Sequence, residues 1–203
     1  MKTFAVASLV AAFLAGSTIA ADPEGIPGYG LVEISWEVQT TSGGPTVVLN
    51  GTMEEVHAQL LEINPKYDQE FAHVQTKRGA VEEAAPKASR NALAKRDNTL
   101  CGNWPSASKS RIQQDINYLR NDVGGRPGNG PGPGNCGRVS CSNNAAIYWC
   151  NDNNFSYTLN GWWEIADGAQ AIVNDCASAA SYVSGQRFIW NGNWNVIVRG
   201  DSC

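Results

Sequence analysis

Apolar and polar positions alternate most clearly in the N-terminal third of the chain. From Val32 to Val38 every second residue is apolar, which predicts a strand with one buried face. Gly-Gly-Pro at 43–45 turns the chain into a second short strand over 46–49. Thr52 and Glu55 then form a capping box, and apolar residues follow at helical spacing. Residues 21–96 are therefore expected to contain a small ββα fold of their own.

Helical spacing of apolar residues predicts two further helices, both in residues 97–203. The first begins at Pro105-Ser106 and runs to Val123 in steps of three and four. Two glycines stop it, and the Gly- and Pro-rich run 124–135 is expected to be an irregular loop. The second helix begins near residues 160–161 and carries an apolar stripe from Trp162 to Cys176.

Two hairpins are predicted, one after each of these helices. The first joins 137–142 to 145–151, and a three-residue loop over 142–144 would place Cys136 opposite Cys150 at bridging distance. The second joins 186–190 to 194–199 through an Asn-Gly turn. This element order predicts an α+β fold, a small disulfide-stabilised two-layer sandwich with two helices on an antiparallel sheet.

Composition divides the chain at Arg96. All six cysteines and six of the seven tryptophans follow that residue. An even cysteine count in a small exported domain predicts a disulfide framework rather than reactive thiols. Cys176 should bridge to the sheet or to the first helix, and Cys203 should fasten the chain end. The expected disulfide residues are Cys101, Cys136, Cys141, Cys150, Cys176 and Cys203.

The N-terminus and the boundary region both indicate export followed by processing. Residues 1–20 have a basic start, a short apolar run and small residues at the end, which is typical of a secretory signal peptide. The polar residues 75–96 contain Lys77-Arg78 and Lys95-Arg96, two dibasic pairs open to a kexin-type processing protease. We therefore expect a signal peptide 1–20, a pro-region 21–96 and a mature domain 97–203, secreted as a monomer.

Charge and residue usage exclude several functional classes. The formal net charge is −4, and residues 97–203 are nearly neutral, which argues against a nucleic-acid partner and against electrostatic attraction to anionic lipid. No stable membrane insertion is expected, because no apolar run reaches 18 residues. Residues 97–203 lack histidine, so they offer no His-based catalysis or zinc ligation. His57 and His73 are expected to be exposed polar residues, and no metal or cofactor is expected. Asn50 and Asn154 are formal glycosylation sites.

A family resemblance can be drawn over residues 101–203. It rests on Cys136-Gly-Arg-Val-Ser-Cys141, on Ala145-Ala-Ile-Tyr-Trp-Cys-Asn-Asp152, on the second helix and on the end Trp194-Asn-Val-Ile-Val-Arg-Gly-Asp-Ser-Cys203. The arrangement resembles fungal cysteine-rich secreted proteins, in particular the virally encoded killer toxin of smut fungi and its cellular relatives, although the toxin has more cysteines. The resemblance implies two helices on an antiparallel sheet and an effector or toxin role.

These features predict a domain that is not an enzyme and that binds an extracellular protein target of a host or competitor cell, such as a receptor or channel. Flexible loops on a rigid scaffold often carry recognition, so the loop 124–135 is the expected contact surface, with Arg126 and Arg138 near its ends. The Arg-Gly-Asp at 199–201 is not expected to act in adhesion, because the nearby Cys203 restricts it.

Two other functions are weighed against target binding. A carbohydrate-binding module would use the tryptophans of residues 97–203, of which Trp163 and Trp190 are expected to be exposed. A small hydrolase would need a carboxylate pair, and the candidates are Glu164, Asp167 and Asp175. Solvated charges on a helix explain those carboxylates more simply.

Overall fold

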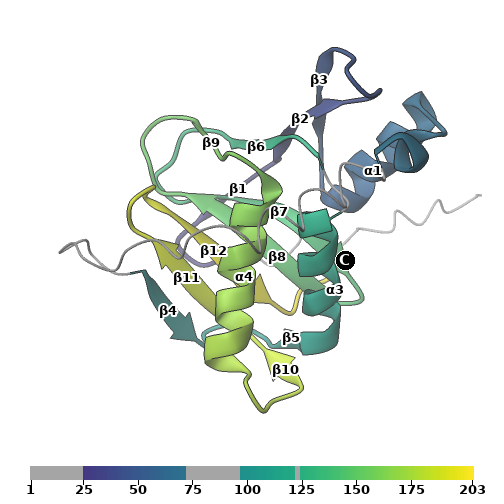
Figure 1. Ribbon diagram of the computed structural model, residues 1–203. Helices are drawn as coiled ribbons and strands as arrows, with labels where there is room; N and C mark the ends of the chain where they lie inside the picture. Colours follow the sequence, from purple (N-terminus) through teal and green to yellow (C-terminus); the bar gives the residue numbers. More distant parts are fainter. Residues whose placement is uncertain (1–24, 72–96, 122–123) are drawn as a thin grey trace, which may run out of the picture.

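The computed structural model describes residues 25–71, 97–121 and 124–203 (Figure 1). The expected signal peptide 1–20, both dibasic pairs, His73 and Val123 lie outside these residues. Among the helices described, none is both long and apolar enough to cross a membrane.

A six-stranded sheet forms the centre of the fold, with the strand order β1-β7-β8-β12-β11-β4. Neighbouring strands are antiparallel except β1 and β7, which are parallel. The strands are β1 (Gly30–Val32), β7 (Asn135–Ser142), β8 (Ala145–Asn151), β12 (Trp194–Arg199), β11 (Gly185–Ile189) and β4 (Asn98–Cys101). Both hairpins expected from the sequence, β7–β8 and β11–β12, are present.

Two helices, α3 (Lys109–Asn121) and α4 (Trp162–Cys176), lie side by side over one face of this sheet (Figure 1). Their apolar stripes are buried against it, including Ile112 and Ile116 on α3 and Trp162 on α4. The α+β architecture with two helices on the sheet is therefore confirmed.

The start of α3 differs from the expectation. The helix begins at Lys109 rather than at Pro105-Ser106, because Ala107–Ser108 forms a short strand, β5. β5 pairs with β10 (Tyr182–Val183), and the amide of Lys109 donates to the carbonyl of Ser181 at 2.9 Å. A tertiary pairing that local sequence does not signal has displaced the first turn of the expected helix.

The β7–β8 hairpin places Cys136 opposite Cys150, and the two cysteines are bridged. The turn has two residues rather than the three expected, which by itself would put the strands out of register by one residue. A β-bulge at Val139 of β7 supplies the missing residue. The expected pair is correct, and the expected loop is wrong.

The other two bridges connect more distant parts of the chain. Cys101–Cys176 joins β4 to the end of α4, so Cys176 does bridge to the sheet. Cys141–Cys203 joins the end of β7 to the last residue of the chain. All three disulfides lie within residues 97–203, which we call the cysteine-rich part.

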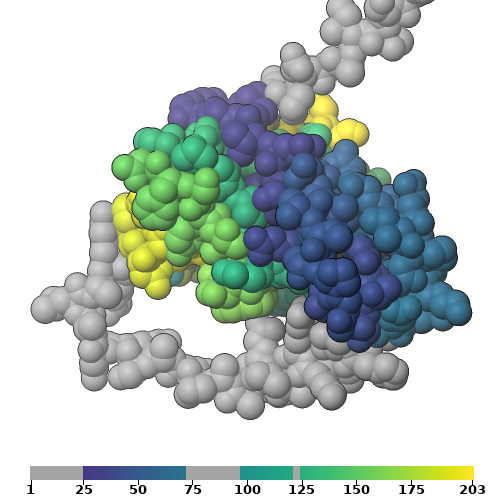
Figure 2. All heavy atoms as spheres, turned by 90° about the horizontal axis from the view of Figure 1, so that it is seen from above, coloured from purple at the N-terminus to yellow at the C-terminus, as the bar shows by residue number. Residues whose placement is uncertain are grey.

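The N-terminal segment, residues 25–71, contains the expected ββα elements. They are β2 (Ser35–Gln39), β3 (Thr46–Asn50) and α1 (Met53–Ile63), and both hydrogen bonds of the capping box at Thr52 and Glu55 are formed. The expectation of a separate fold is wrong. β1 joins the main sheet, and β2 joins a second sheet of order β3-β2-β6-β9. The segment therefore lies directly against the cysteine-rich part, as Figure 2 shows.

The Gly- and Pro-rich run 124–135 is not an irregular loop throughout. Arg126–Asn129 forms β6, which lies between β2 and β9 (Tyr157–Thr158). The carbonyl of Pro127 accepts from the amide of Leu159 at 3.0 Å, so Pro127 bonds on the β9 side. The missing proline N–H therefore costs no bond toward β2, which is why this composition can be a strand.

The turn between β7 and β8 gives a direct test of this hairpin. Asn143 and Asn144 have φ of 50° and 59°, in the left-handed region. Asn144 is exposed, so its replacement should act through the backbone. We predict that Asn144→Ala lowers the free energy of unfolding by about 1 kcal/mol, while Asn144→Gly preserves it. Equal denaturant midpoints for the two variants would contradict the turn geometry.

Candidate functional site

The contact between the N-terminal segment and the cysteine-rich part, which we call the seam, is built on two strand edges. Residues Gly30–Val32 run parallel to the outer edge of β7, opposite residues 135–137. A few residues later the same stretch of chain pairs antiparallel with β6, with Ser35 opposite Gly128. The hydroxyl of Ser35 donates to the carbonyl of Gly128 at 3.2 Å. One extended stretch therefore occupies the edges of both sheets.

Apolar side chains of this stretch fill the seam. Ile34 and Trp36 are buried in the same core cluster as α3 and α4. The Trp36 ring stacks on that of Trp162, with centroids 3.2 Å apart and planes 21° apart. The indole N–H of Trp36 donates to the carbonyl of Gly51 at 2.8 Å, whereas the buried indole nitrogen of Trp162 has no hydrogen-bond partner.

The opposite face of the main sheet is also covered by the segment. Ile26 belongs to a second apolar cluster with the Cys136–Cys150 bridge and Tyr148, and Tyr29 packs against it. The Tyr29 hydroxyl accepts from the side-chain amide of Gln186 at 2.9 Å. The segment thus wraps the β7 edge of the sheet from one face to the other.

Two glycines of the cysteine-rich part make room for the segment. A Cβ on Gly137 would overlap the Ile34 side chain, and its next neighbour would be the carbonyl oxygen of Val32. A Cβ on Gly128 would lie 2.8 Å from the hydroxyl oxygen of Ser35. At both positions the atoms nearest to an added Cβ belong to the N-terminal segment, so a side chain there would clash mainly with that segment.

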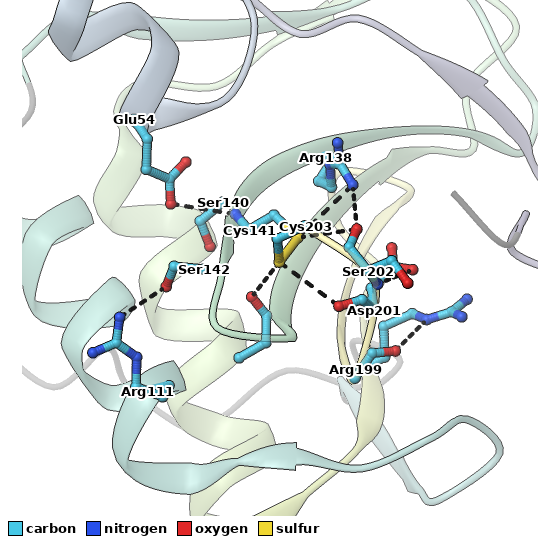
Figure 3. Close-up of a disulfide and its surroundings, with 12 residues drawn as sticks. Glu54, Arg111, Arg138, Ser140, Cys141, Ser142, Arg199, Asp201, Ser202 and Cys203 are labelled. Atoms are coloured by element: carbon cyan, nitrogen blue, oxygen red, sulfur yellow. Dashed lines mark hydrogen bonds between the residues drawn. A yellow bond between two sulfur atoms is a disulfide. The ribbon is translucent and has the colours of Figure 1, made fainter. Parts of the chain in front are cut away.

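Two carboxyl groups, those of Glu54 and Asp115, lie where α1 and α3 meet the end of β7. Figure 3 shows Glu54 beside the Cys141–Cys203 bridge. Glu54 of α1 accepts from the Cys141 amide at 3.2 Å, but its second oxygen is buried without a hydrogen-bond partner. Asp115 of α3 is 4% exposed and accepts from the hydroxyl groups of Ser140 and Ser142.

Burial changes the acidity of both carboxyl groups, and the charge of Glu54 adds to the effect at Asp115. Desolvation, with a contribution from the charge of Glu54, raises the pKa of Asp115 to about 6. Desolvation also raises the pKa of Glu54, against hydrogen bonds that lower it. The seam therefore holds these carboxyl groups most favourably when they are protonated.

The two arginines expected to contact a target both lie at the seam. Arg126 is exposed in β6 opposite Glu37, and its Nε donates to the carbonyl of Leu159 at 3.2 Å. Arg138 lines an open cleft of about 320 Å³ between the segment and the sheet, together with Glu33, Glu55 and Tyr148. Sequence reasoning placed these arginines at a free loop, whereas the structure places them against residues 25–71.

The expected tryptophans do not form one platform. Trp163 is 44% exposed and lines a cleft of about 240 Å³ that also contains Glu164 and Asp167. Trp190 is half-buried and stacks with Phe188, 5.8 Å between centroids, and it does not line that cleft. The cleft at Trp163 is the surface that a carbohydrate-binding or hydrolytic function would use.

The three candidate carboxylates of a hydrolase each have another partner. Glu164 accepts from the amide of Asn160 at 2.7 Å, and Asp167 pairs with Arg120. Asp175 accepts from the Thr99 hydroxyl at 2.6 Å. These contacts fit structural roles on the surface of α4.

The remaining sequence candidates are placed as follows. Asn50 and Asn154 are exposed, as glycosylation requires. His57 bonds to Asp68 at 2.9 Å, and no cluster of three potential metal ligands occurs among the described residues. The side chains of Arg199 and Asp201 are buried, so the adhesion tripeptide is not displayed.

Sequence reasoning missed the carboxyl pair. Asp115 did carry a signal, because it falls three residues after Ile112 and directly before Ile116, within the apolar stripe of its helix. A charged residue in that position is rarely buried without a partner. Glu54 carried no such signal, since the second position of a helix commonly holds an exposed acid.

The raised pKa values give a pH dependence with a definite sign. Between the ordinary carboxyl pKa and the raised one, the folded protein binds more protons than the unfolded chain, so stability falls as pH rises. We predict a loss of about 1–2 kcal/mol in the free energy of unfolding from about pH 4 to pH 7 attributable to this pair. Glu54→Gln should flatten the profile, and Glu62→Gln on the exposed side of α1 should leave it unchanged. Parallel profiles for all three proteins would contradict the assignment.

Comparison with known proteins finds no match for this chain among family models, curated proteins or solved structures. The resemblance to fungal killer toxins thus rests on the residues quoted for it. The seam is the candidate functional site, because the arginines expected to bind a target, two strand edges and the buried Glu54 and Asp115 carboxyl groups all meet residues 25–71 there.

Proposed function

We propose that the chain is a secreted precursor of a target-binding domain, an effector or killer-toxin-like protein that acts without catalysis. In this proposal residues 97–203 are the mature domain, and residues 21–96 are a pro-region that covers its binding surface until the dibasic pairs are cut. The observation that carries the proposal is the seam itself. Residues 25–71 occupy the surface around Arg126 and Arg138, which sequence reasoning assigned to the target.

The covalent structure supports separation after a cut. Every disulfide lies within residues 97–203, and the chain has no cysteine before Cys101. After cleavage at Arg96, packing and strand pairing alone would hold the two pieces together. The bridges would limit local unfolding of the released domain, as suits a protein exposed to extracellular proteases.

The seam also contains features that weaken it. One oxygen of Glu54 is buried without a hydrogen-bond partner. Such a group costs about 1–3 kcal/mol relative to a satisfied one. The carboxyl pair adds repulsion as pH rises, because the raised pKa of Asp115 is about 6. A segment that must dissociate after cleavage is expected to make suboptimal contacts, and the unpaired Glu54 oxygen and the carboxyl repulsion are contacts of that kind.

A carbohydrate-binding function is the second candidate, and the observation that favours it is the cleft at Trp163. That ring is exposed beside acidic side chains, an arrangement that can stack on a sugar and accept its hydroxyl hydrogen bonds. The cleft is not covered by residues 25–71, so sugar binding would not depend on processing. The two candidate functions can therefore be distinguished by whether the activity requires cleavage at the dibasic pairs.

The proposal predicts the composition of the secreted product. Mass spectrometry should find a species that begins at Asp97 and is about six mass units lighter than its reduced form, since six cysteines each lose one hydrogen. The N-terminal fragment should elute with it under native conditions at about pH 5, and the two should separate in denaturant without reductant. A single uncut chain that begins near residue 21 would contradict the precursor role.

Activity should follow processing in the same way. The secreted wild type should affect growth of competing microbes or viability of plant tissue, and a Lys95→Ala/Arg96→Ala variant together with Lys77→Ala/Arg78→Ala should not. Trp163→Ala is the matched control, because it alters the surface away from the seam. If the uncut variant is as active as the wild type, or if the activity depends on Trp163, the carbohydrate function is favoured instead.

A further inference from the structure

We propose that the surface beneath the N-terminal segment binds an extended peptide strand of a partner protein, with an aliphatic residue and an aromatic residue two positions apart. This inference rests on the proposed function, because the partner can enter only where the segment has left. It adds the chemical class of the partner, which is a peptide strand that completes the sheet edges and not a folded protein surface, a membrane or a sugar.

Two strand edges lie beneath the N-terminal segment. Without β1 the main sheet ends at β7, and without β2 the edge of β6 is unpaired on that side. Unpaired edges offer rows of backbone donors and acceptors, which is how β-augmentation sites bind peptides. Residues 30–37 engage both edges in one extended run, so a peptide of similar length can do the same.

The surface also has two side-chain sites at a fixed spacing. Ile34 fits against Gly137, where the absence of a Cβ creates the room, and Trp36 stacks on Trp162. The two residues are two positions apart, which puts them on the same face of a strand. The surface therefore selects aliphatic-x-aromatic on the inner face of whatever strand replaces the segment.

Trp162 also offers an unused hydrogen-bond donor. Its ring stacks on Trp36, and its indole nitrogen is buried without a hydrogen-bond partner. A partner strand that places a backbone carbonyl or a polar side chain at the edge of the Trp162 ring, in the plane of this N–H, can accept a hydrogen bond from it. The segment does not, so a partner strand has a contact available that the segment lacks.

Charged side chains at the seam favour acidic residues in the partner strand. On the outward side of the segment, Glu37 lies opposite Arg126 in the β2–β6 pairing, and Glu33 lines the same cleft as Arg138. Outward residues alternate with the inner Ile34 and Trp36, as strand geometry requires. A partner strand with acidic residues at these outward positions would be complementary to the arginines.

A peptide-display selection tests the inference on the folded precursor. The protein is cut in vitro by a dibasic-specific protease, immobilised at about pH 7.5 and exposed to a library of random peptides, with uncut protein as the reference. We expect selected peptides with aliphatic-x-aromatic spacing and flanking acids that bind the cut protein at least about tenfold more tightly than the uncut protein. A synthetic peptide of residues 29–39 should compete with them.

Two protein variants keep the test specific. Gly137→Ala should weaken the selected peptides by about tenfold or more, because its Cβ meets the inner aliphatic residue. Trp163→Ala should leave their affinity unchanged. Alanine in place of the aromatic residue in the peptide should reduce binding about as much as Gly137→Ala, which tests the site even if that variant folds poorly.

The outcomes distinguish this inference from the proposed function. Selected peptides without the spacing, equal binding to cut and uncut protein, or no competition by residues 29–39 would each overturn the peptide site. Failure of the proposed function would be seen instead in the secreted product, as an uncut chain, because the selection uses protein that is cut in vitro.

Discussion

One apolar core shared by two stretches of chain that no disulfide joins is the constraint on which the rest of the structure depends. Trp36 from the N-terminal segment and Trp162 from α4 stack at its centre, and both are almost fully buried. Large aromatic side chains contribute strongly to burial, so the segment is held by packing although no covalent bond fixes it. The bridges, by contrast, stabilise residues 97–203 alone.

This shared core accounts for residues whose intrinsic strand propensity is low but which lie in strands. A strand made of Arg-Pro-Gly-Asn has poor intrinsic propensity, yet β6 forms because strands of both parts pair with it on its two sides. Gly137 lies within the long strand β7, where glycine is unfavourable, and the approach of Ile34 explains it. Both positions are consistent once residues 25–71 are counted as part of the same fold.

Sequence patterns predicted what depends on neighbours along the chain. The stripes of α3 and α4, the capping box of α1 and both hairpins follow from periodicity and turn chemistry. The parallel pairing of β1 with β7 and the meeting of Glu54 with Asp115 could not be predicted, because they join residues far apart in sequence. The candidate site could be predicted in part. Arg126 and Arg138 were singled out from the sequence, but the contact of residues 25–71 with them was not predicted.

Amide hydrogen exchange before and after cleavage tests the shared core most directly. The Gly128 and Arg126 amides face β2, since the intervening Pro127 bonds toward β9. The account predicts strong protection at these two amides and at Cys136, whose amide faces β1, in the intact chain. This protection should be lost after cleavage and removal of the segment at about pH 8, while the centre of β8 stays protected. Unchanged protection at the two edges, with the segment gone, would contradict it.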